Sequence, residues 1–305
     1  MVKKKVGEVK VIIGFIGFGE VGYEMSIGLL EDGVSKIYAF DPLYESEMVQ
    51  NRVKKSGVIL CSTEEELLQQ KVDVVIVAVP ANQSYVSWQH ISKFLNNSTI
   101  YVDVSTASAS EKTKVYEEIM KKEKLFVDAA MMGPLTAHKH QVPIYASGNG
   151  TDLFKNLMSP YNMNITKVSE QPGDATNIKF IRSIFTKGVS TLLFEVLELA
   201  HDLNLEDVIL DSISETMDEA PFEEIANRLI TGTAIHSGRR EKEMENVIAF
   251  VKENEKNPIM SQATKDKLNW LTSLGLKEEF NSQKPNDWKL VVKKISEGVI
   301  KNEKA

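Results

Sequence analysis

Short runs of consecutive apolar residues alternate with helical patterns through the first half of the chain. The four clearest runs lie at 11–16, 36–40, 73–79 and 99–104, and further strands are predicted at 125–130, 143–148 and 165–168. In the four clearest runs the apolar residues occupy successive positions rather than alternate ones, so both faces of these strands are expected to be covered by helices. The pattern therefore predicts an α/β fold, a doubly wound parallel sheet of the Rossmann type, that ends near residue 172.

The second half of the chain shows no strand-like runs. Residues 174–201 form one long helical pattern, and helical stretches separated by short breaks follow it. At about 150 residues per domain, a chain of 305 residues fits two domains. We expect an NAD(P)-binding Rossmann domain at residues 1–172 and an all-helical substrate and dimerisation domain at residues 173–305. Within the first domain, Thr63 followed by Glu66 predicts a capping box at the start of a helix.

Charge and cysteine content exclude several classes of protein. The chain has 36 basic and 43 acidic residues and a formal net charge of -7, which disfavours nucleic acid and anionic membrane surfaces as partners. Cys61 is the only cysteine, which excludes an intramolecular disulfide and a cysteine-based metal cluster. The apolar segment near the N-terminus is short, and no stretch approaches the roughly 18 apolar residues of a membrane helix. We therefore expect a cytoplasmic protein.

A glycine motif follows the first predicted strand and opens the first predicted helix. Gly17, Gly19 and Gly22 have the spacing G-x-G-x-x-G, with Glu20 and Val21 between the last two glycines. Glycines at these positions allow a tight turn, a close approach of the backbone to pyrophosphate and close packing of the helix on the strand. The helix N-terminus stabilises the anion. In this context the motif predicts that these residues bind a dinucleotide.

Asp41 ends the second predicted strand, where a carboxylate can accept hydrogen bonds from the ribose hydroxyl groups of adenosine. A 2′-phosphate at this position would meet a like charge. NAD is therefore the favoured cofactor, although the basic residues within 52–55 leave NADP open. The alternative interpretation of Asp41-Pro42 is a turn that only ends the strand.

Lys179 heads a polar stripe on the long helical pattern. Ser183, Thr186 and Ser190 follow it on the same face, while apolar residues occupy another. One explanation is that this stripe faces water. However, the helix leaves the nucleotide domain just after its last strand, so its first turns are expected to border the interdomain cleft. A lysine acts as a general base only when its pKa falls well below about 10.4, which burial and the charge of Arg182 both promote.

Over nearly its whole length, the chain resembles the β-hydroxyacid dehydrogenase family, which includes 3-hydroxyisobutyrate and phosphogluconate dehydrogenases. The nucleotide motif of the family matches the three glycines, and its turn after the fourth strand is similar to Val79-Pro80. Its substrate motif, D-x-S-T, is similar to DVSTASA, in which Asp103 is retained. The resemblance implies a cofactor site that includes Val79, Pro80 and Thr106, and a substrate site that includes Ser105, Thr106 and Ala107.

The catalytic motif of the family, G-x-G-x-x-x-K-x-x-x-N, is similar to GDATNIKFIRS. Gly173 is kept, Ala175 replaces the second glycine, and Ser183 replaces the asparagine. Lys179 occupies the lysine position. The resemblance implies that Lys179 takes the hydroxyl proton of the substrate while hydride passes to nicotinamide, and returns it in the reverse direction. Ser183, the second catalytic candidate, lacks the second polar group and the reach of an amide, so the substrate can differ from the common ones of the family.

The loop after the sixth strand also departs from the family. The glycine pair that supplies backbone donors to a substrate carboxylate corresponds here to Gly133-Pro134, and proline has no N–H to donate. Met132 replaces a small serine and makes the pocket more apolar, and the resemblance still implies that Met132 and Gly133 contact the substrate. Ala109 stands where the substrate motif has a proline. With these substitutions, the chain resembles a phosphogluconate dehydrogenase-like branch of the family. This resemblance does not identify the substrate.

His236, Arg239 and Arg240 lie close together on a later helical segment. His236 and Arg240 are candidates for contact with an anionic substrate across the cleft. A solvated basic face paired with Glu241 and Glu243 explains the same pattern equally well.

His138 and His140 flank Lys139 in the loop after Gly133. A metal ion would need further ligands that the sequence does not offer nearby, so we predict no metal site. We interpret both histidines as loop residues that could line the cleft.

The leading interpretation is an NAD(P)-dependent β-hydroxyacid dehydrogenase that acts on a small 3-hydroxy acid or its keto form. An imine reductase on the same scaffold is one alternative. A dinucleotide-binding sensor without turnover is another alternative. The residues Ser183 and Pro134 favour this interpretation, and the retained Lys179 disfavours it. The wide apolar face of the long helix predicts a homodimer. The sequence leaves open the substrate, the physiological direction and any coupled decarboxylation.

Overall fold

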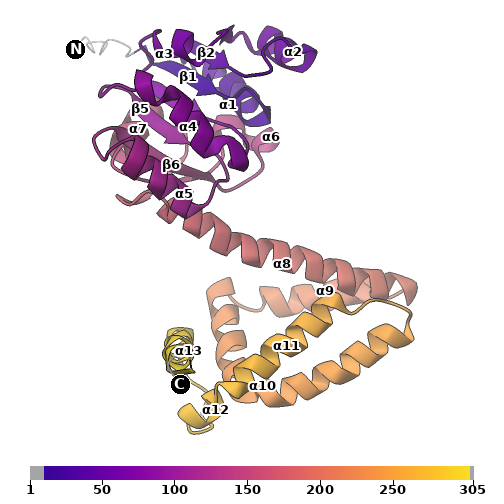
Figure 1. The fold of residues 1–305 in the computed structure, drawn as a ribbon. Coiled ribbons are helices and arrows are strands. Elements are labelled where there is room, and N and C mark those ends of the chain that lie inside the picture. The colour runs from indigo at the N-terminus through magenta and orange to yellow at the C-terminus, as the bar shows by residue number, and fades with distance from the viewer. Residues whose placement is uncertain (1–9, 303–305) are drawn as a thin grey trace, which may run out of the picture. The chain divides into compact units, whose positions relative to one another are not determined.

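A computed structural model describes residues 10–302 of the chain. Two compact units make up the fold, and the boundary between them follows Ile184, inside the long helix α8 (Asp174–Asp202). Figure 1 shows this helix leaving the first unit and continuing into the second. The sequence places the domain boundary at residue 172, before this helix and where the strand pattern ends.

The first unit is built on an eight-stranded sheet with the order β3-β2-β1-β4-β5-β6-β7-β8. All neighbouring strands are parallel except β6 and β7, which pair antiparallel, so the prediction of a parallel sheet is wrong at this pair. A two-residue strand, β3, was not predicted. The strands are β1 (Ile12–Ile16), β2 (Lys36–Phe40), β3 (Ile59–Leu60), β4 (Val74–Val77), β5 (Ile100–Asp103), β6 (Leu125–Met131), β7 (Ile144–Ser147) and β8 (Ile165–Ser169).

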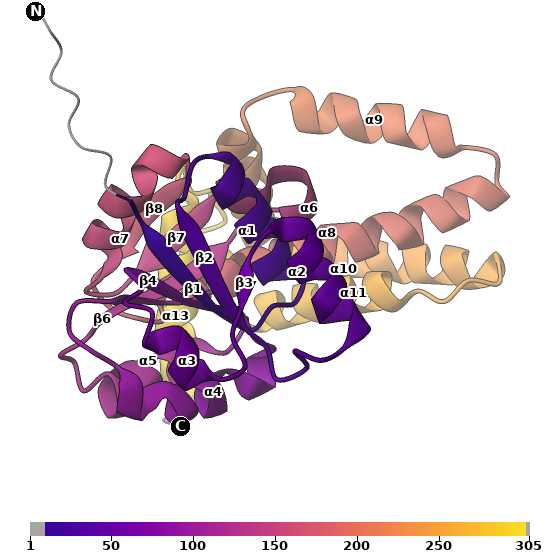
Figure 2. The same ribbon diagram turned by 90° about the horizontal axis from the view of Figure 1, so that it is seen from above.

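Helices cover both faces of this sheet, as the apolar runs predict (Figure 2). Alternate residues of one strand belong to separate hydrophobic cores: Val74 and Ile76 of β4 lie in one core, and Val75 and Val77 lie in the other. The first core includes residues of α1 and α7, and the second includes residues of α3 and α4. The helices of this unit are α1 (Glu20–Glu31), α2 (Glu47–Ser56), α3 (Glu64–Leu68), α4 (Ser84–Ile91), α5 (Ala109–Lys114), α6 (Leu135–His138), α7 (Thr151–Met158) and the start of α8.

Thr63 caps α3, as predicted, by accepting a hydrogen bond from the backbone N–H of Glu66 at 3.1 Å. The second half of the capping box differs from the prediction. The Glu66 carboxylate accepts from the backbone N–H of Ser62 at 2.8 Å, one residue before the N-cap. The helix start is stabilised in the same way, because the carboxylate still lies at the positive end of the helix dipole.

Among the described residues from Phe185, the second unit consists of helices and connecting turns without a strand, and α10 and α11 pack along each other. A small core forms from Ala234 of α10, Leu276 of α12 and Val291 of α13. None of the described helices has both the length and the apolar character needed to cross a membrane. Besides the end of α8, the helices are α9 (Glu206–Asp218), α10 (Phe222–Glu253), α11 (Ile259–Ser273), α12 (Leu276–Glu279) and α13 (Trp288–Asn302).

Candidate active site

A cavity of about 400 Å³ opens beyond the carboxyl ends of β1, β2 and β4. This is where an open α/β sheet binds ligands, because the chain crosses to opposite sides of the sheet after neighbouring strands. The predicted cofactor residues that line the cavity are Gly17, Gly19, Asp41, Val79 and Pro80.

The three glycines of the motif have different roles in the structure. Gly17 has a φ of 89°, and a Cβ on it would lie 2.6 Å from the carbonyl oxygen of Ala78. A Cβ on Gly22 would lie 2.8 Å from the carbonyl oxygen of Gly17, so this glycine allows the helix to pack closely on the turn. Gly19, in contrast, has nothing within 4 Å of its Cβ position. The open side of Gly19 leaves room for a pyrophosphate at the N-terminus of α1.

Asp41 is held in place by two backbone groups. One carboxylate oxygen accepts from the N–H of Phe18, inside the glycine motif, at 2.8 Å, and the other accepts from the N–H of Leu43 at 2.9 Å. Arg52 donates to the carbonyl oxygen of Phe18 at 3.3 Å, so a basic side chain also lies against this loop. The carboxylate is therefore fixed at the rim of the cavity, where a ribose would bind.

Sequence reasoning missed several residues that line the cavity. Glu64 at the start of α3, together with Val86 and His90 of α4, contributes to its wall. These helices follow β3 and β4, and the carboxyl ends of all parallel strands of a sheet lie at the same edge. This rule could have indicated these residues from the sequence, but it requires the strands to be known, and β3 was not predicted. Of the other predicted cofactor residues, Glu20, Val21, Gly22 and Thr106 lie outside the cavity wall.

The loop after β5 carries the predicted substrate residues. Ser105 is buried, Thr106 is exposed and Ala107 is buried. The hydroxyl of Ser105 accepts from the N–H of Ala107 at 3.3 Å, and its own N–H donates to Asp103 at 2.9 Å. Of these three residues, Thr106 is thus the one whose side chain is accessible to a ligand.

Lys179 and Ser183 lie one turn apart on α8, both half-buried and both within the first unit. The helix begins after Gly173, whose φ of 104° favours glycine. Backbone N–H groups of Gly173 and Thr176 both donate to the buried carboxylate of Asp128 at 3.0 Å. The predicted catalytic pair therefore lies on a helix whose first turn is anchored to the sheet.

The loop after β6 contacts the same helix. Arg182 donates to the carbonyl oxygen of Met132 at 2.8 Å, which places its guanidinium beside the residue before Gly133. Met132 is half-buried and Gly133 is exposed. The structure therefore brings the loop of Met132 and Gly133, which are predicted to contact the substrate, next to the first turns of α8, which carry the predicted base.

The remaining substrate candidates lie in the second unit, on α10. His236 is exposed and Arg240 is half-buried. Arg240 donates to the hydroxyl of Thr233 at 2.5 Å, so its side chain runs back along the helix. Arg239 pairs with Glu243 at 3.1 Å, as the solvated-face interpretation expects for that residue.

His140 differs from its interpretation as a loop residue lining the cleft. It is buried against α1, and its Nε2 lies 2.8 Å from a carboxylate oxygen of Asp32 and 2.9 Å from the carbonyl oxygen of Tyr161. Its role is therefore to pack the loop onto α1. Among the described residues, no group of histidine, cysteine and acidic side chains could hold a metal ion.

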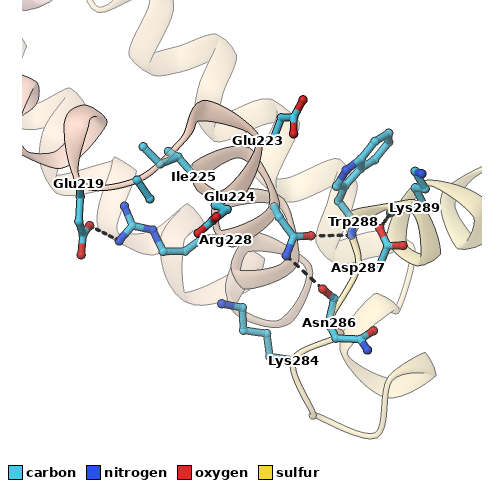
Figure 3. A pocket seen from close by; sticks show the side chains of 12 residues that line it. Glu219, Glu223, Glu224, Ile225, Arg228, Lys284, Asn286, Asp287, Trp288 and Lys289 are labelled. Atoms are coloured by element: carbon cyan, nitrogen blue, oxygen red, sulfur yellow. Dashed lines mark hydrogen bonds and ion pairs between the residues drawn. The ribbon is translucent and has the colours of Figure 1, made fainter.

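A second cavity, of about 730 Å³, lies in the helical unit between α10 and the start of α13 (Figure 3). Arg228 pairs there with Glu219 at 2.6 Å. Asn227 accepts from the N–H of Trp288 at 2.8 Å and donates to the carbonyl oxygen of Asn286 at 3.1 Å. The two hydrogen bonds of Asn227 join α10 to the start of α13, whereas Glu219 lies just before α10. None of these groups belongs to the predicted site.

Comparison with known proteins gives consistent results over both units. The family described as the NAD binding domain of 6-phosphogluconate dehydrogenase matches residues 12–159, and a domain of unknown function, DUF1932, matches residues 200–271. An uncharacterised 28.5 kDa protein of Methanothermus fervidus is 30% identical over 254 residues, which are 83% of this chain and 96% of that protein.

Two solved structures show the same fold. A conserved protein of unknown function, MTH1747, is described as structurally similar to 3-hydroxyacid dehydrogenases. It is 31% identical, with a TM-score of 0.58 over 86% of this chain and 97% of its own. An imine reductase of Streptomyces aurantiacus reaches a TM-score of 0.74 over 92% of this chain and 98% of its own, at 13% identity. At that identity the similarity concerns the fold alone.

Proposed function

Because the chain belongs to the family that joins the NAD-binding domain of 6-phosphogluconate dehydrogenase to a DUF1932 domain, we propose that it is a hydride-transferring dehydrogenase of small 3-hydroxy acids. The membership confirms the resemblance inferred from the motifs, and the chain is an NAD(P)-binding protein. The observation that carries the proposal is a lysine on the anchored start of α8, next to the loop that contains Gly133.

The cavity beside β1 and β4 fits a dinucleotide. The open side of Gly19 accommodates a pyrophosphate, and the fixed carboxylate of Asp41 accepts hydrogen bonds from a ribose. When bound, the nicotinamide accepts or supplies the hydride. We assign NAD rather than NADP, because Asp41 would repel a 2′-phosphate.

Lys179 is the proposed general base and acid. It takes the hydroxyl proton of the substrate at Nζ as the alcohol is oxidised, and returns a proton when the carbonyl is reduced. This role requires the neutral amine at the moment when the proton is taken. Lys179 is half-buried on the anchored first turns of α8. Ser183 supports the hydroxyl from the next turn, and Thr106 and Gly133 hold the carboxylate side of the substrate.

The central experiment compares Lys179→Ala with Lys187→Ala, a matched variant of an exposed lysine further along α8. Wild type is expected to bind NADH, measured by fluorescence, and to oxidise at least one member of a panel of 3-hydroxy acids. Removal of a general base typically costs about 10²- to 10⁴-fold in kcat, so Lys179→Ala should fall in that range. Lys187→Ala should keep the wild-type rate. Equal rates in wild type and Lys179→Ala would remove the proposed base.

An imine reductase is the second candidate. The apolar Met132 and the missing N–H of Pro134 both favour a substrate without a carboxylate at this loop. The solved imine reductase shares the fold over almost the whole chain. Testing cyclic imines with NADPH and NADH beside the hydroxy acids discriminates the two activities. Tight NADH binding without turnover of either class would instead support the dinucleotide sensor.

We also infer that two copies of the chain associate through the apolar surface of α8 and α9. No residue of α9 is buried in the single chain, and Val208 on it is 64% exposed. On α8, Ile184 and Phe194 are 76% and 75% exposed. An isolated helix as short as α9 is only marginally stable in water, so a partner surface is needed to cover its apolar side chains. The extent of this surface supports a second copy of the same chain.

A further inference from the structure

A buried ion pair lies beneath the start of α8. Lys112 of α5 and Asp128 of β6 are both fully inaccessible to solvent, and their charged groups are 2.8 Å apart. Lys112 also donates to the carbonyl oxygen of Asp103 at 3.1 Å and lies 3.5 Å from the carboxylate of that residue. Burial opposes charge on both Lys112 and Asp103. The charges and hydrogen bonds of Asp103 and Asp128 outweigh it for Lys112, whose pKa is raised. The charge of Lys112 and the hydrogen bonds to the carboxylate outweigh it for Asp103, whose pKa is lowered.

On one side, this pair holds the helix that carries Lys179. Asp128 accepts from the N–H of Gly173 and of Thr176, each at 3.0 Å, and from the hydroxyl of Thr176 at 2.7 Å. The carboxylate thus caps α8 from a neighbouring strand rather than from the chain that precedes the helix. Thr176 lies three residues before Lys179, so the two residues lie one turn apart on the helix.

On the other side, the pair holds the loop after β5. The carboxylate of Asp103 accepts from the N–H of Ser105 at 2.9 Å and from the indole N–H of Trp88 at 2.7 Å. The hydroxyl of Ser84 donates to it as well, at 2.9 Å. A continuous chain of buried polar contacts therefore runs from Ser105 to Thr176 through Lys112.

Stability alone gives a weak reason for such a cluster. Removing charges from water is costly, and replacing a buried ion pair by apolar residues of similar volume is often neutral or stabilising. A fully bonded polar cluster does, however, define one geometry, because each buried group needs its own partner at its own angle. The two elements joined here carry the proposed base and the proposed substrate loop.

We propose that Lys112, Asp128 and Thr176 are positioning residues that fix the first turns of α8, and thereby the amine of Lys179, relative to the loop of Ser105 and Thr106. The effect on turnover rests on the proposed function. The mechanical link between the two elements does not depend on it.

The first test replaces the hydroxyl of Thr176. Thr176→Val keeps the side-chain shape and removes the donor, while Thr176→Ser restores it. Misplacement of a reacting group by about 1 Å can cost about 10²-fold in rate, so Thr176→Val should lower kcat by about tenfold. NADH affinity and the KM for the substrate should change by less than about twofold, and Thr176→Ser should recover most of kcat. Asp128→Asn should show a larger loss of the same kind.

Glu195→Gln is the control for a structural effect, because Glu195 caps a helix in the second unit. This variant is expected to lower the melting temperature and leave kcat unchanged. A loss of kcat in Thr176→Val no greater than in Glu195→Gln would overturn the proposal.

A second readout does not need turnover. Amide hydrogen exchange is measured at Ser105 and Thr176 in wild type and in Thr176→Val. If the cluster links the two elements, the amide of Ser105 should exchange faster in the variant, although it lies on a different loop. Unchanged exchange at Ser105 with faster exchange at Thr176 would show that the two elements are held independently and would overturn the link. Faster exchange at Ser105 together with an undiminished Lys179→Ala would retain the link and reject the proposed function.

Discussion

The single cysteine is protected by its surroundings. Cys61 is buried, and burial together with the nearby charge of Glu66 raises its pKa to about 11 from an ordinary value of 9.0. The thiolate is the reactive form, so the native protein should not react with a thiol reagent at pH 8. One equivalent should react after unfolding in urea. Rapid reaction of the native protein would contradict this burial.

The same residue makes a contribution of known sign to the pH dependence of stability. Because the folded state holds the Cys61 proton more tightly than the unfolded state, its contribution is complete below about pH 9 and is lost as the pH rises toward 11. Urea unfolding of wild type and Cys61→Ala between pH 7 and pH 10.5 measures it. The stability difference between the two proteins should shrink at the alkaline end.

Gly28 is the residue on α1 that permits the approach of His140. A Cβ at this position would lie 2.1 Å from Nδ1 of His140, whose ring is also bonded to Asp32. Gly28→Ala should therefore destabilise the protein by about 1–3 kcal/mol in urea unfolding, as overpacking does. Gly188→Ala is the matched control, because nothing lies within 4 Å of its Cβ position on α8. That variant should be neutral or stabilising, by up to about 1 kcal/mol.

The sequence indicated the residues of the cofactor site whose role depends on local backbone. Gly17 and Asp41 belong to one strand-turn-helix unit and its neighbouring strand, and both line the cavity. Lys112 and Asp128 could not be paired in the same way. Their contact depends on the register in which β5 and β6 align Asp103 with Asp128, and no local pattern records that register.

At the scale of elements, α11 depends on a side chain from another helix. Glu195 of α8 accepts from the N–H of Met260 at 2.6 Å, and from the N–H and hydroxyl of Ser261 at 2.9 and 2.6 Å. Burial opposes the charge, but these hydrogen bonds outweigh it and the pKa of Glu195 is lowered. The carboxylate therefore does the work of an N-cap that the chain before Ile259 does not provide.

Glu195→Gln should cost about 1–2 kcal/mol in the free energy of unfolding at pH 7, the range of a lost helix cap. A lowered pKa means that the contribution is present above the unfolded value of about 4.5 and is lost as the pH falls through the folded pKa. Urea unfolding at pH 7 and at pH 3 measures both effects. A difference between wild type and variant that does not shrink as the pH falls from 7 to 3 would contradict the role of the charge.

The hydrophobic pattern predicted where strands form, but it did not predict the direction in which each strand runs. The run at 143–148 predicted a strand, and β7 occupies Ile144–Ser147. The connection between the two strands consists of α6 and the turn after it. It brings the chain back into the sheet at the end where β6 finishes, so β7 runs antiparallel to β6. A run of consecutive apolar residues is the same in both directions, so the sequence pattern could not distinguish them.

For the whole molecule, the exposed apolar surface of α8 and α9 bears on the oligomeric state. We expect light scattering at micromolar concentration to give twice the mass of 34.2 kDa. Phe194→Glu should weaken the proposed dimer at least about tenfold, because it places a charge in the proposed interface. Leu153→Glu, on an exposed position of α7 in the first unit, should leave the dimer unchanged. A monomeric mass for wild type would reject the association.

The boundary after Ile184 leaves the proposed chemistry within the first unit. Every proposed group for holding the dinucleotide and moving a proton, from Gly17 to Ser183, precedes it, whereas His236 and Arg240 follow it. Substitutions of these two residues are therefore expected to change the preference for anionic substrates, while the proposed dinucleotide site and the proposed base stay intact.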